Sequence, residues 1–380
     1  MKVPGGAKVP GGAPLRVGVA GVGRIGRMHA ELLANRVPGA KLAAVSDAVA
    51  SLAGEVGQAL GVPALGTERL LSDPSIDVVA ICAPTEQHVA LIVEAASAGK
   101  AAIFCEKPIS LDLGEVDRAL AAVSAAGTSL MVGFNRRFDP SHAAVRQAVV
   151  SGAIGVPHVV RITSRDPEPP PMEYARGSGG IFLDMTVHDF DMARFVVGSE
   201  VAEIYAVGAV RVEPALAEMG DVDTAVITLR HVDGCLTSID NSRKAVYGYD
   251  QRVEVLGSGG MASSANPHVH TAQVCDAEGA RLAPLPYFFL ERYEESYLRQ
   301  WEAFVGAVRS GSAPPTSGRD GRAALVLGLA ARRSLAEGRP VAVGEVPGEQ
   351  RGAGPSGPSS GLSPGAGPGA STGTGPGVRT

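Results

Sequence analysis

Short apolar runs alternate with helical segments from Leu15 to Gly133. The runs lack polar alternation and cover residues 15–20, 41–46, 77–83, 101–105 and 129–133. Continuous apolar runs of this length are typical of parallel strands covered on both faces. Two of the helical segments end at Gly99 and Gly127, and glycine commonly terminates helices. The pattern therefore predicts an α/β domain over residues 15–136, a Rossmann-type doubly wound parallel sheet.

The pattern changes after Phe138. Segments rich in β-branched residues, separated by turn sequences, cover residues 157–165, 200–212, 222–230, 235–241 and 251–257. They predict a large, mostly antiparallel, open-faced sheet. Helices are expected at about 184–198, 290–310 and 319–337. Residues 137–345 are therefore predicted to form a second, α+β domain.

The composition separates the ends of the chain from its body. The 380 residues include 49 glycines and 27 prolines, and residues 346–380 alone hold 11 and 6 of them. Residues 1–14 contain the unit KVPGGA twice. Segments of this composition bury too little apolar surface to fold, so residues 1–14 and 346–380 are predicted to be disordered.

Charge and cysteine content restrict the possible partners. The formal net charge is −5, and proteins that bind nucleic acids or anionic membranes usually present a basic surface. The charge therefore argues against a nucleic-acid or membrane partner. The longest apolar run, 323–331, is much shorter than the roughly 20 residues of a membrane span. The sequence therefore predicts a cytoplasmic protein without a metal site, because its cysteines lie far apart at Cys82, Cys105, Cys235 and Cys275.

A glycine-rich turn follows the first predicted strand and opens a helix. In this context Gly21, Gly23 and Gly26 match the pattern that binds the pyrophosphate of a dinucleotide. Gly21 permits the tight turn, Gly23 lets the backbone approach the ligand, and Gly26 lets helix and strand pack closely. Arg24 and Ile25 complete the turn at the helix N-terminus, where unpaired N–H groups attract an anion.

Asp47 ends the second predicted strand, 21 residues beyond Gly26. A carboxylate at this place accepts hydrogen bonds from the adenosine ribose and repels a 2′-phosphate. The sequence therefore favours NAD over NADP. A helix-capping role for Asp47 is the structural alternative, and the two roles are compatible.

Three charged residues are spaced for one face of a helix. Asp184, His188 and Asp191 stand at i, i+4 and i+7 if the helix begins near Asp184, and Asp189 then points elsewhere. A histidine beside carboxylates suits proton transfer. Two other interpretations stay open: a surface helix with a solvated His188, and a metal site, which would lack a second nearby His or Cys.

The segment Cys105-Glu106-Lys107-Pro108 directly follows a buried strand. Ligands of open α/β sheets bind beyond the carboxyl ends of the strands, so Lys107 is expected at the cofactor crevice. A solvated loop lysine is the alternative. Pro108 permits a cis peptide bond.

Five motifs in order resemble the Gfo/Idh/MocA oxidoreductase family. They are GVGRIGRMH (21–29), APTEQH (83–88), CEKP (105–108), GFNRRFDP (133–140) and DMTVHDFDMARF (184–195). The resemblance spans residues 15–342, and segments 184–195 and 241–260 most resemble inositol 2-dehydrogenases within the family.

The resemblance implies NAD-dependent oxidation of myo-inositol at C2 to 2-keto-myo-inositol (scyllo-inosose), as in inositol catabolism. By the matching motifs, His188 is the general base, Asp184 orients the polyol or the imidazole, and Lys107 hydrogen-bonds the reacting hydroxyl. Arg136, Asp191 and Tyr247 resemble positions that line the polyol pocket. The positions implied beside the cofactor are Pro84, Thr85, His88, Glu106 and Lys107.

Other functions stay open on the same scaffold. The residues do not distinguish myo-inositol from its isomers or from a pyranose sugar. A regulator that binds NAD without chemistry is a third possibility, although it could dispense with Lys107 or His188. The family resemblance also implies a homo-oligomer, a dimer or tetramer paired through the exposed face of the second sheet.

Overall fold

The first sheet is parallel and has five strands. The computed structural model describes residues 12–348, and its sheet has the order β2-β1-β3-β4-β5. The strands are β1 (Leu15–Ala20), β2 (Ala40–Ser46), β3 (Val78–Ile81), β4 (Ala102–Cys105) and β5 (Ser129–Val132). All four pairings are parallel, which confirms the predicted doubly wound sheet.

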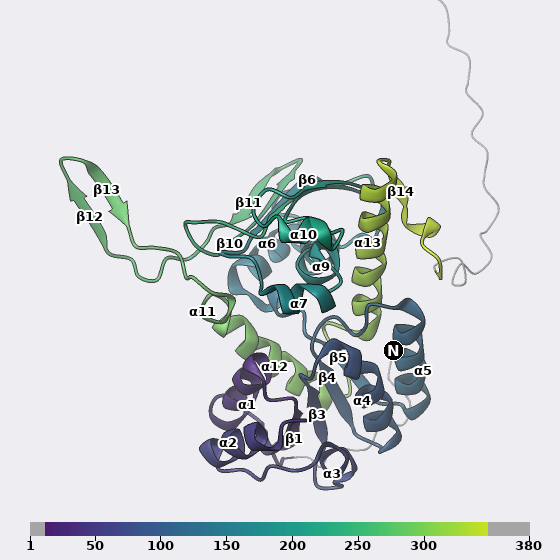
Figure 1. The fold of residues 1–380 in the computed structure, drawn as a ribbon. Helices are drawn as coiled ribbons and strands as arrows, with labels where there is room; N and C mark the ends of the chain where they lie inside the picture. Colours follow the sequence, from purple (N-terminus) through teal and green to yellow (C-terminus); the bar gives the residue numbers. More distant parts are fainter. Residues whose placement is uncertain (1–11, 349–380) are drawn as a thin grey trace, which may run out of the picture.

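Helices cover both faces of this sheet (Figure 1). They are α1 (Arg24–Asn35), α2 (Ala50–Leu60), α3 (Thr67–Ser72), α4 (Thr85–Ser97) and α5 (Leu113–Ala126). The Asp112 carboxylate caps α5 by accepting a hydrogen bond from the Glu115 N–H, 2.9 Å away. Gly127 ends α5 with a left-handed backbone (φ +66°), which glycine adopts without strain.

The second sheet has seven strands in the order β11-β10-β6-β9-β8-β7-β14. They are β6 (Pro157–Arg165), β7 (Val201–Ala209), β8 (Thr224–His231), β9 (Leu236–Ser242), β10 (Asp250–Gly257), β11 (Gly260–Ser264) and β14 (Val341–Ala342). Within the described residues its pairings are antiparallel except for β6 with β9. Buried and exposed residues alternate along β8, so one face of the sheet is open, as predicted.

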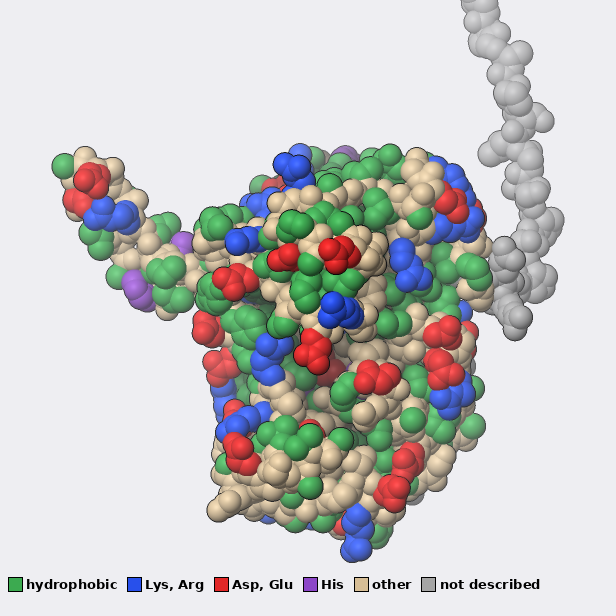
Figure 2. All heavy atoms as spheres, viewed as in Figure 1, with side chains coloured by type: hydrophobic (Ala, Val, Ile, Leu, Met, Phe, Trp, Pro, Cys, Tyr) green, Lys and Arg blue, Asp and Glu red, His purple; other side chains and the backbone are tan. Residues whose placement is uncertain are grey.

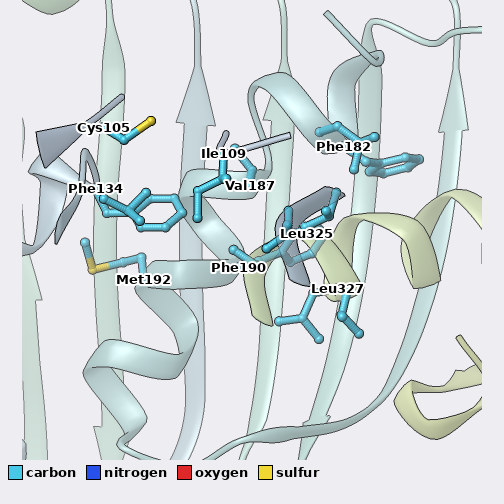
Figure 3. Close-up of a cluster of buried hydrophobic side chains, with 14 of the residues drawn as sticks. Cys105, Ile109, Phe134, Phe182, Val187, Phe190, Met192, Leu325 and Leu327 are labelled. Atoms are coloured by element: carbon cyan, nitrogen blue, oxygen red, sulfur yellow. The ribbon is translucent and has the colours of Figure 1, made fainter. Parts of the chain in front are cut away.

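Helices pack on the other face of this sheet. They are α6 (Pro140–Val150), α9 (Val187–Val197) and α13 (Gly318–Glu337). The short helix α8 (Ile181–Asp184) packs on α9 and α13, and α7 (Met172–Gly177) and α10 (Ala215–Glu218) pack on each other. Two 3-10 turns, η1 (Asn135–Phe138) and η2 (Val343–Glu345), flank this layer. Phe134, Phe190 and Leu325 belong to one buried cluster that continues from the first sheet into the second domain (Figure 3).

A helix from the C-terminal part of the chain packs on the first sheet. Helices α11 (Phe289–Arg292) and α12 (Glu294–Ser310) run along the Rossmann domain (Figure 1). Trp301 of α12 is fully buried in the same apolar cluster as Val17 and Phe104. The spatial unit around the first sheet therefore includes residues distant in sequence. The hairpin β12 (Gln273–Asp276) and β13 (Gly279–Leu282) projects from the body.

The helix predicted at 184–198 is broken. Helix α8 ends at Asp184 and α9 begins at Val187, so Asp184 and His188 do not share one helix face. The one-face interpretation of Asp184, His188 and Asp191 is therefore wrong. At the C-terminus, Val346 is buried, although it lies beyond the predicted end of the folded body.

The disorder predicted for residues 1–11 and 349–380 falls outside the described residues. Within residues 12–348, no helix is long and apolar enough to cross a membrane.

Candidate active site

The glycine turn between β1 and α1 leaves space at one glycine and none at the other two. A Cβ atom on Gly21 (φ +90°) would lie 2.5 Å from the Ala83 nitrogen, and one on Gly26 would lie 1.9 Å from the Gly21 oxygen. A Cβ atom on Gly23 would meet nothing within 4 Å. The protein therefore requires glycine at positions 21 and 26 for its own packing, whereas the surface at Gly23 is open to a ligand.

Asp47 holds the glycine turn from the end of β2. Its Oδ2 atom accepts a hydrogen bond from the Val22 N–H at 2.8 Å, and its Oδ1 atom accepts one from the Val49 N–H at 2.9 Å. The helix-capping alternative for Asp47 is wrong, because the N-cap of α2 is Val49 and no side chain caps that helix. The Asp47 side chain is partly exposed. Arg24 is the first residue of α1, and its guanidinium lies 5.1 Å from the centroid of the Phe288 ring.

His88 is buried and joins two loops at the carboxyl edge of the sheet. Its Nδ1 atom lies 2.8 Å from the Pro108 oxygen and its Nε2 atom 2.7 Å from the Ala83 oxygen. Both ring nitrogens are therefore occupied by main-chain groups, and the ring fixes the loops. Pro84 and Thr85 begin α4 beside the glycine turn, where Pro84 is exposed.

Glu106 points into the protein and pairs with a histidine. Trp301 donates its indole N–H to His29 Nδ1 at 2.9 Å, so the other ring nitrogen of His29 carries the proton and donates to Glu106 Oε1 at 2.8 Å. The second oxygen of Glu106 accepts the Lys107 N–H at 3.2 Å. This buried chain fixes the loop that carries Lys107, whose peptide bond to Pro108 is cis.

Lys107 reaches from the first domain to the second. Its Nζ atom lies 2.8 Å from the main-chain oxygen of Asp184 and 3.5 Å from Asp184 Oδ1. The Asp184 carboxylate also accepts hydrogen bonds from Tyr174 at 2.8 Å and from Arg243 at 3.3 Å. Burial acts to raise the pKa of Asp184, but Lys107 and Arg243 outweigh it and hold the pKa below its ordinary value. Asp184 is therefore a carboxylate at neutral pH.

His188 is buried and lies within the field of the same charged residues. Burial, reinforced by the positive charges of Arg136 and Lys107, lowers the pKa of His188 well below its ordinary value. Its Nδ1 atom is buried without a hydrogen-bond partner in the described part of the chain. The ring lies edge-on to Phe134, with centroids 6.0 Å apart. The imidazole therefore carries no charge at neutral pH and can accept a proton.

Arg136 pairs with Asp189. The helical spacing predicted that Asp189 points away from Asp184, His188 and Asp191. Arg136 Nη1 donates to Asp189 Oδ1 at 2.8 Å and to Ser164 Oγ at 3.0 Å, and Nη2 donates to Tyr249 Oη at 3.4 Å. Asn241 donates a further hydrogen bond to Asp189 at 2.9 Å. Asp189 follows His188 on α9, and its carboxylate meets residues of η1 and β9.

Asp191 and Tyr247 bind other partners. Both oxygens of Asp191 accept hydrogen bonds from Arg137, at 2.7 and 2.5 Å. The Tyr247 hydroxyl accepts from Arg165 at 2.9 Å and donates to Asp250 at 2.8 Å on a half-exposed surface. The structure does not bring these two side chains into hydrogen-bond contact with Lys107, Asp184 or His188.

Tyr174 and Arg243 contact Asp184 but were not predicted. Arg243 lies in segment 241–260, which carries the likeness to inositol 2-dehydrogenases, whereas Tyr174 lies in a segment without a recognisable motif. The space-filling view is hollowed between the two domains, and acidic side chains lie at that level (Figure 2). No group of three or more His, Cys, Asp or Glu residues within 12–348 is arranged to hold a metal ion.

Two parts of the chain match known protein families. Residues 15–134 match the "Oxidoreductase family, NAD-binding Rossmann fold", and residues 142–263 match the "GFO/IDH/MocA C-terminal domain". The chain belongs to the Gfo/Idh/MocA oxidoreductase family. The family predicted from five sequence motifs is thereby confirmed.

Similar Gfo/Idh/MocA proteins are named as inositol dehydrogenases. A myo-inositol 2-dehydrogenase from Thermotoga maritima is 49% identical over 336 residues, which cover 88% of this chain and 100% of that protein. An inositol 2-dehydrogenase from Rhizobium meliloti is 44% identical over 87% of this chain and 99% of its own length. A solved structure of scyllo-inositol dehydrogenase from Lactobacillus casei, with bound NAD(H) and scyllo-inositol, matches with a TM-score of 0.81 at 29% identity. That match covers 87% of this chain and 99% of the solved chain.

Proposed function

We propose that this protein oxidises myo-inositol at C2 to 2-keto-myo-inositol with NAD as the oxidant, as a step of inositol catabolism. The observation that carries the proposal is the contact of Lys107 with Asp184, together with the buried imidazole of His188, on whose pKa the Lys107 charge acts. The 49% identity to a myo-inositol 2-dehydrogenase over nearly the whole folded chain supports the choice of substrate.

The residues of the first domain fit a dinucleotide. A side chain at Gly23 would fill the space that a pyrophosphate needs, and the helix α1 begins there without a side-chain cap. We expect the Asp47 carboxylate, which follows β2 and is partly exposed, to accept hydrogen bonds from the adenosine ribose, and this favours NAD over NADP. NAD, when bound, supplies the acceptor for the hydride.

Lys107, Asp184 and His188 have different roles in the proposed reaction. His188 receives the hydroxyl proton, because its imidazole is neutral and not hydrogen-bonded at Nδ1. Lys107 uses two of its three N–H groups on Asp184, so the third remains for the reacting hydroxyl oxygen. Asp184 stays negative and holds the Lys107 ammonium in place. The carbinol carbon loses a hydride as its hydroxyl loses a proton, and a carbonyl results.

The test is NAD reduction by purified protein with myo-inositol. We expect turnover, and we expect His188→Ala to lower kcat by about 10²–10⁴-fold. His231→Ala is the control, because His231 is buried on β8 and bonds Ser199 and Thr237. Absence of turnover with every inositol isomer would refute the proposal, and so would a fully active His188→Ala variant.

A dehydrogenase for another inositol isomer is the second candidate. The solved structure from Lactobacillus casei, named for scyllo-inositol, has the same fold at 29% identity. A panel of inositol isomers and pyranose sugars, ranked by kcat/KM with NAD and with NADP, decides between the substrates. Turnover with any member excludes a regulator without activity.

We further propose that the protein works as a cytoplasmic homo-oligomer, a dimer or tetramer, paired through the open face of the second sheet. Apolar side chains on these strands are exposed: Tyr205, Val207, Val226, Leu236 and Leu256. All four cysteines are free, which suits a reducing compartment. Light scattering should give a mass above that of one chain, and Val226→Lys should lower it. A monomeric wild-type protein would contradict this proposal.

A further inference from the structure

Arg243 is a buried cation with unused hydrogen-bond donors. The residue is 1% exposed, and its position is fixed because its main-chain N–H donates to the Asp223 oxygen at 2.8 Å. Nη1 donates to Asp184 Oδ2 at 3.3 Å, whereas Nε and Nη2 are buried without a partner in the described residues. Buried donors are normally paired, so these two groups are available to a polar ligand that accepts hydrogen bonds. What distinguishes Arg243 is its contact with Asp184.

Asp166 lies next to Arg243 at the end of the neighbouring strand. Strands β6 and β9 are parallel and pair through Arg165 and Ser242, so the residues that follow them, Asp166 and Arg243, leave the sheet side by side. The Asp166 N–H donates to the Ser242 oxygen at 2.9 Å, and the Asp166 oxygen accepts the Ala245 N–H at 2.7 Å.

The main chain of Asp166 is therefore fixed, while its carboxylate makes no hydrogen bond to another described residue. Four charged groups act on this carboxylate. Arg243 and Arg136 are positive, and Asp184 and Asp189 are negative. Asp184 and Asp189 are the same residues that meet Lys107 and Arg136, so the free carboxylate belongs to the site described above.

We propose that Arg243 and Asp166 bind a pair of neighbouring hydroxyl groups on the substrate ring and so determine which polyol is accepted. This inference rests on the proposed polyol oxidation. A hydroxyl both donates and accepts, and the two side chains supply the complementary groups. The Nε and Nη2 donors of Arg243 form a planar fork that fits two adjacent oxygens, and the carboxylate of Asp166 accepts their O–H groups.

The alternative role for Arg243 is to position Asp184 alone, and it predicts different kinetics. A residue that binds substrate hydroxyls in the ground state changes KM, whereas one that acts only through Asp184 changes kcat. Arg243→Lys keeps the positive charge beside Asp184 but removes the fork. Asp166→Asn keeps the size of the side chain but removes its charge. This variant still tests the proposal if Arg243→Lys does not fold.

The first experiment measures myo-inositol oxidation at saturating NAD. We expect Arg243→Lys and Asp166→Asn each to raise the KM for myo-inositol tenfold or more, with kcat changed less than threefold and the KM for NAD unchanged. Arg292→Lys is the matched control. Arg292 is also buried with unpartnered Nε and Nη2 atoms, but it pairs with Asp139 at 2.6 Å. Its replacement should leave the KM for myo-inositol unchanged.

The second experiment repeats the comparison with a panel of monodeoxy-inositols. The analogue that lacks the hydroxyl bound by Arg243 should be oxidised with a kcat/KM that differs less than twofold between wild type and Arg243→Lys. The inference is overturned if kcat falls without a change in KM, or if every analogue shows the full loss. Failure of the wild type to oxidise any inositol refutes the proposed function itself, which separates the two failures.

Discussion

The Lys107 ammonium bonds the main-chain oxygen of Asp184 at 2.8 Å and lies 3.5 Å from the carboxylate of the same residue. Lys107 lies two positions beyond the end of β4 in the first domain, and Asp184 ends α8 in the second. This contact joins a loop of the dinucleotide domain to a buried carboxylate of the second domain. The relative position of the two domains therefore determines the geometry of the site.

Replacing Lys107 should affect the chemical step. Lys107→Met removes the donor for the reacting oxygen and a positive charge beside Asp184, and we expect kcat to fall about 10²–10⁴-fold. Lys107→Arg keeps the charge but not the position of the donor, and should recover part of the loss. Steady-state kinetics with saturating NAD measures both. A Lys107→Met variant with at least half the wild-type kcat would contradict the assignment.

The pH dependence should reflect the lowered pKa of His188. Burial and the nearby cations Arg136 and Lys107 disfavour the imidazolium, so the neutral base persists as the pH falls below the ordinary histidine value of about 6.5. The acid limb of kcat/KM, which reports the free enzyme, should therefore have its midpoint below pH 6.5. A midpoint at or above that value would show that another group limits the reaction.

A separate effect on substrate binding should come from Asp166. Burial raises the pKa of Asp166 to about 6. The negative charges of Asp184 and Asp189 also raise this pKa, whereas the positive charges of Arg243 and Arg136 lower it. Because a protonated carboxyl accepts hydrogen bonds less well, the KM for the polyol should rise as the pH falls through about 6. In Asp166→Asn this step should be absent, while the limb assigned to His188 remains. A step that persists in the variant would assign it to a different residue.

The glycine turn offers a matched pair of variants. A Cβ atom on Gly26 would lie 1.9 Å from the Gly21 oxygen, so Gly26→Ala should lower both the melting temperature and the affinity for NAD. A Cβ atom on Gly23 meets no protein atom within 4 Å, so Gly23→Ala should leave the melting temperature unchanged and raise the Kd for NAD. Thermal unfolding and calorimetric titration with NAD measure these effects. Equal destabilisation by both substitutions would argue against an open ligand surface at Gly23.

Asp320 should contribute stability that depends on pH. Burial acts to raise its pKa, but Arg137 and the Ser317 hydroxyl outweigh this and lower the pKa of Asp320 to about 2. A carboxyl with a lowered folded-state pKa stabilises the fold above its unfolded value near 4, and this contribution is lost as the pH falls from about 4 to 2.

Asp320→Asn should therefore cost about 1–3 kcal/mol of unfolding free energy at pH 7 and less at pH 3. Urea unfolding at the two pH values is the measurement. Asp117→Asn, which removes a half-exposed partner of Arg322, should cost less than about 1 kcal/mol. A cost for Asp320→Asn that does not change between the two pH values would exclude the linkage.

Much of the architecture could be predicted from local sequence. Continuous apolar runs such as 129–133 and helix ends such as Gly127 depend on neighbouring residues, and the observed strands and helices lie close to the predicted ranges. The glycine turn is local as well, because its three glycines act within one strand–helix connection. The family assignment followed from motifs of the same kind and agrees with the two family matches.

The partners of each charged side chain were decided by the tertiary structure. Helical spacing placed Asp191 on the face of His188 and Asp189 away from it. In the structure Asp189 pairs with Arg136, whose charge acts on the pKa of His188, and Asp191 pairs with Arg137. Such pairings depend on how distant segments pack, which periodicity within one segment does not contain.

Arg243 and Asp166 make the same point most clearly. They are 77 positions apart in the sequence and become neighbours because β6 and β9 pair in parallel. The sequence by itself thus determined the elements, the dinucleotide turn and the residues with chemistry. The pairing of strands and the packing of the two domains decided which of those residues share a site.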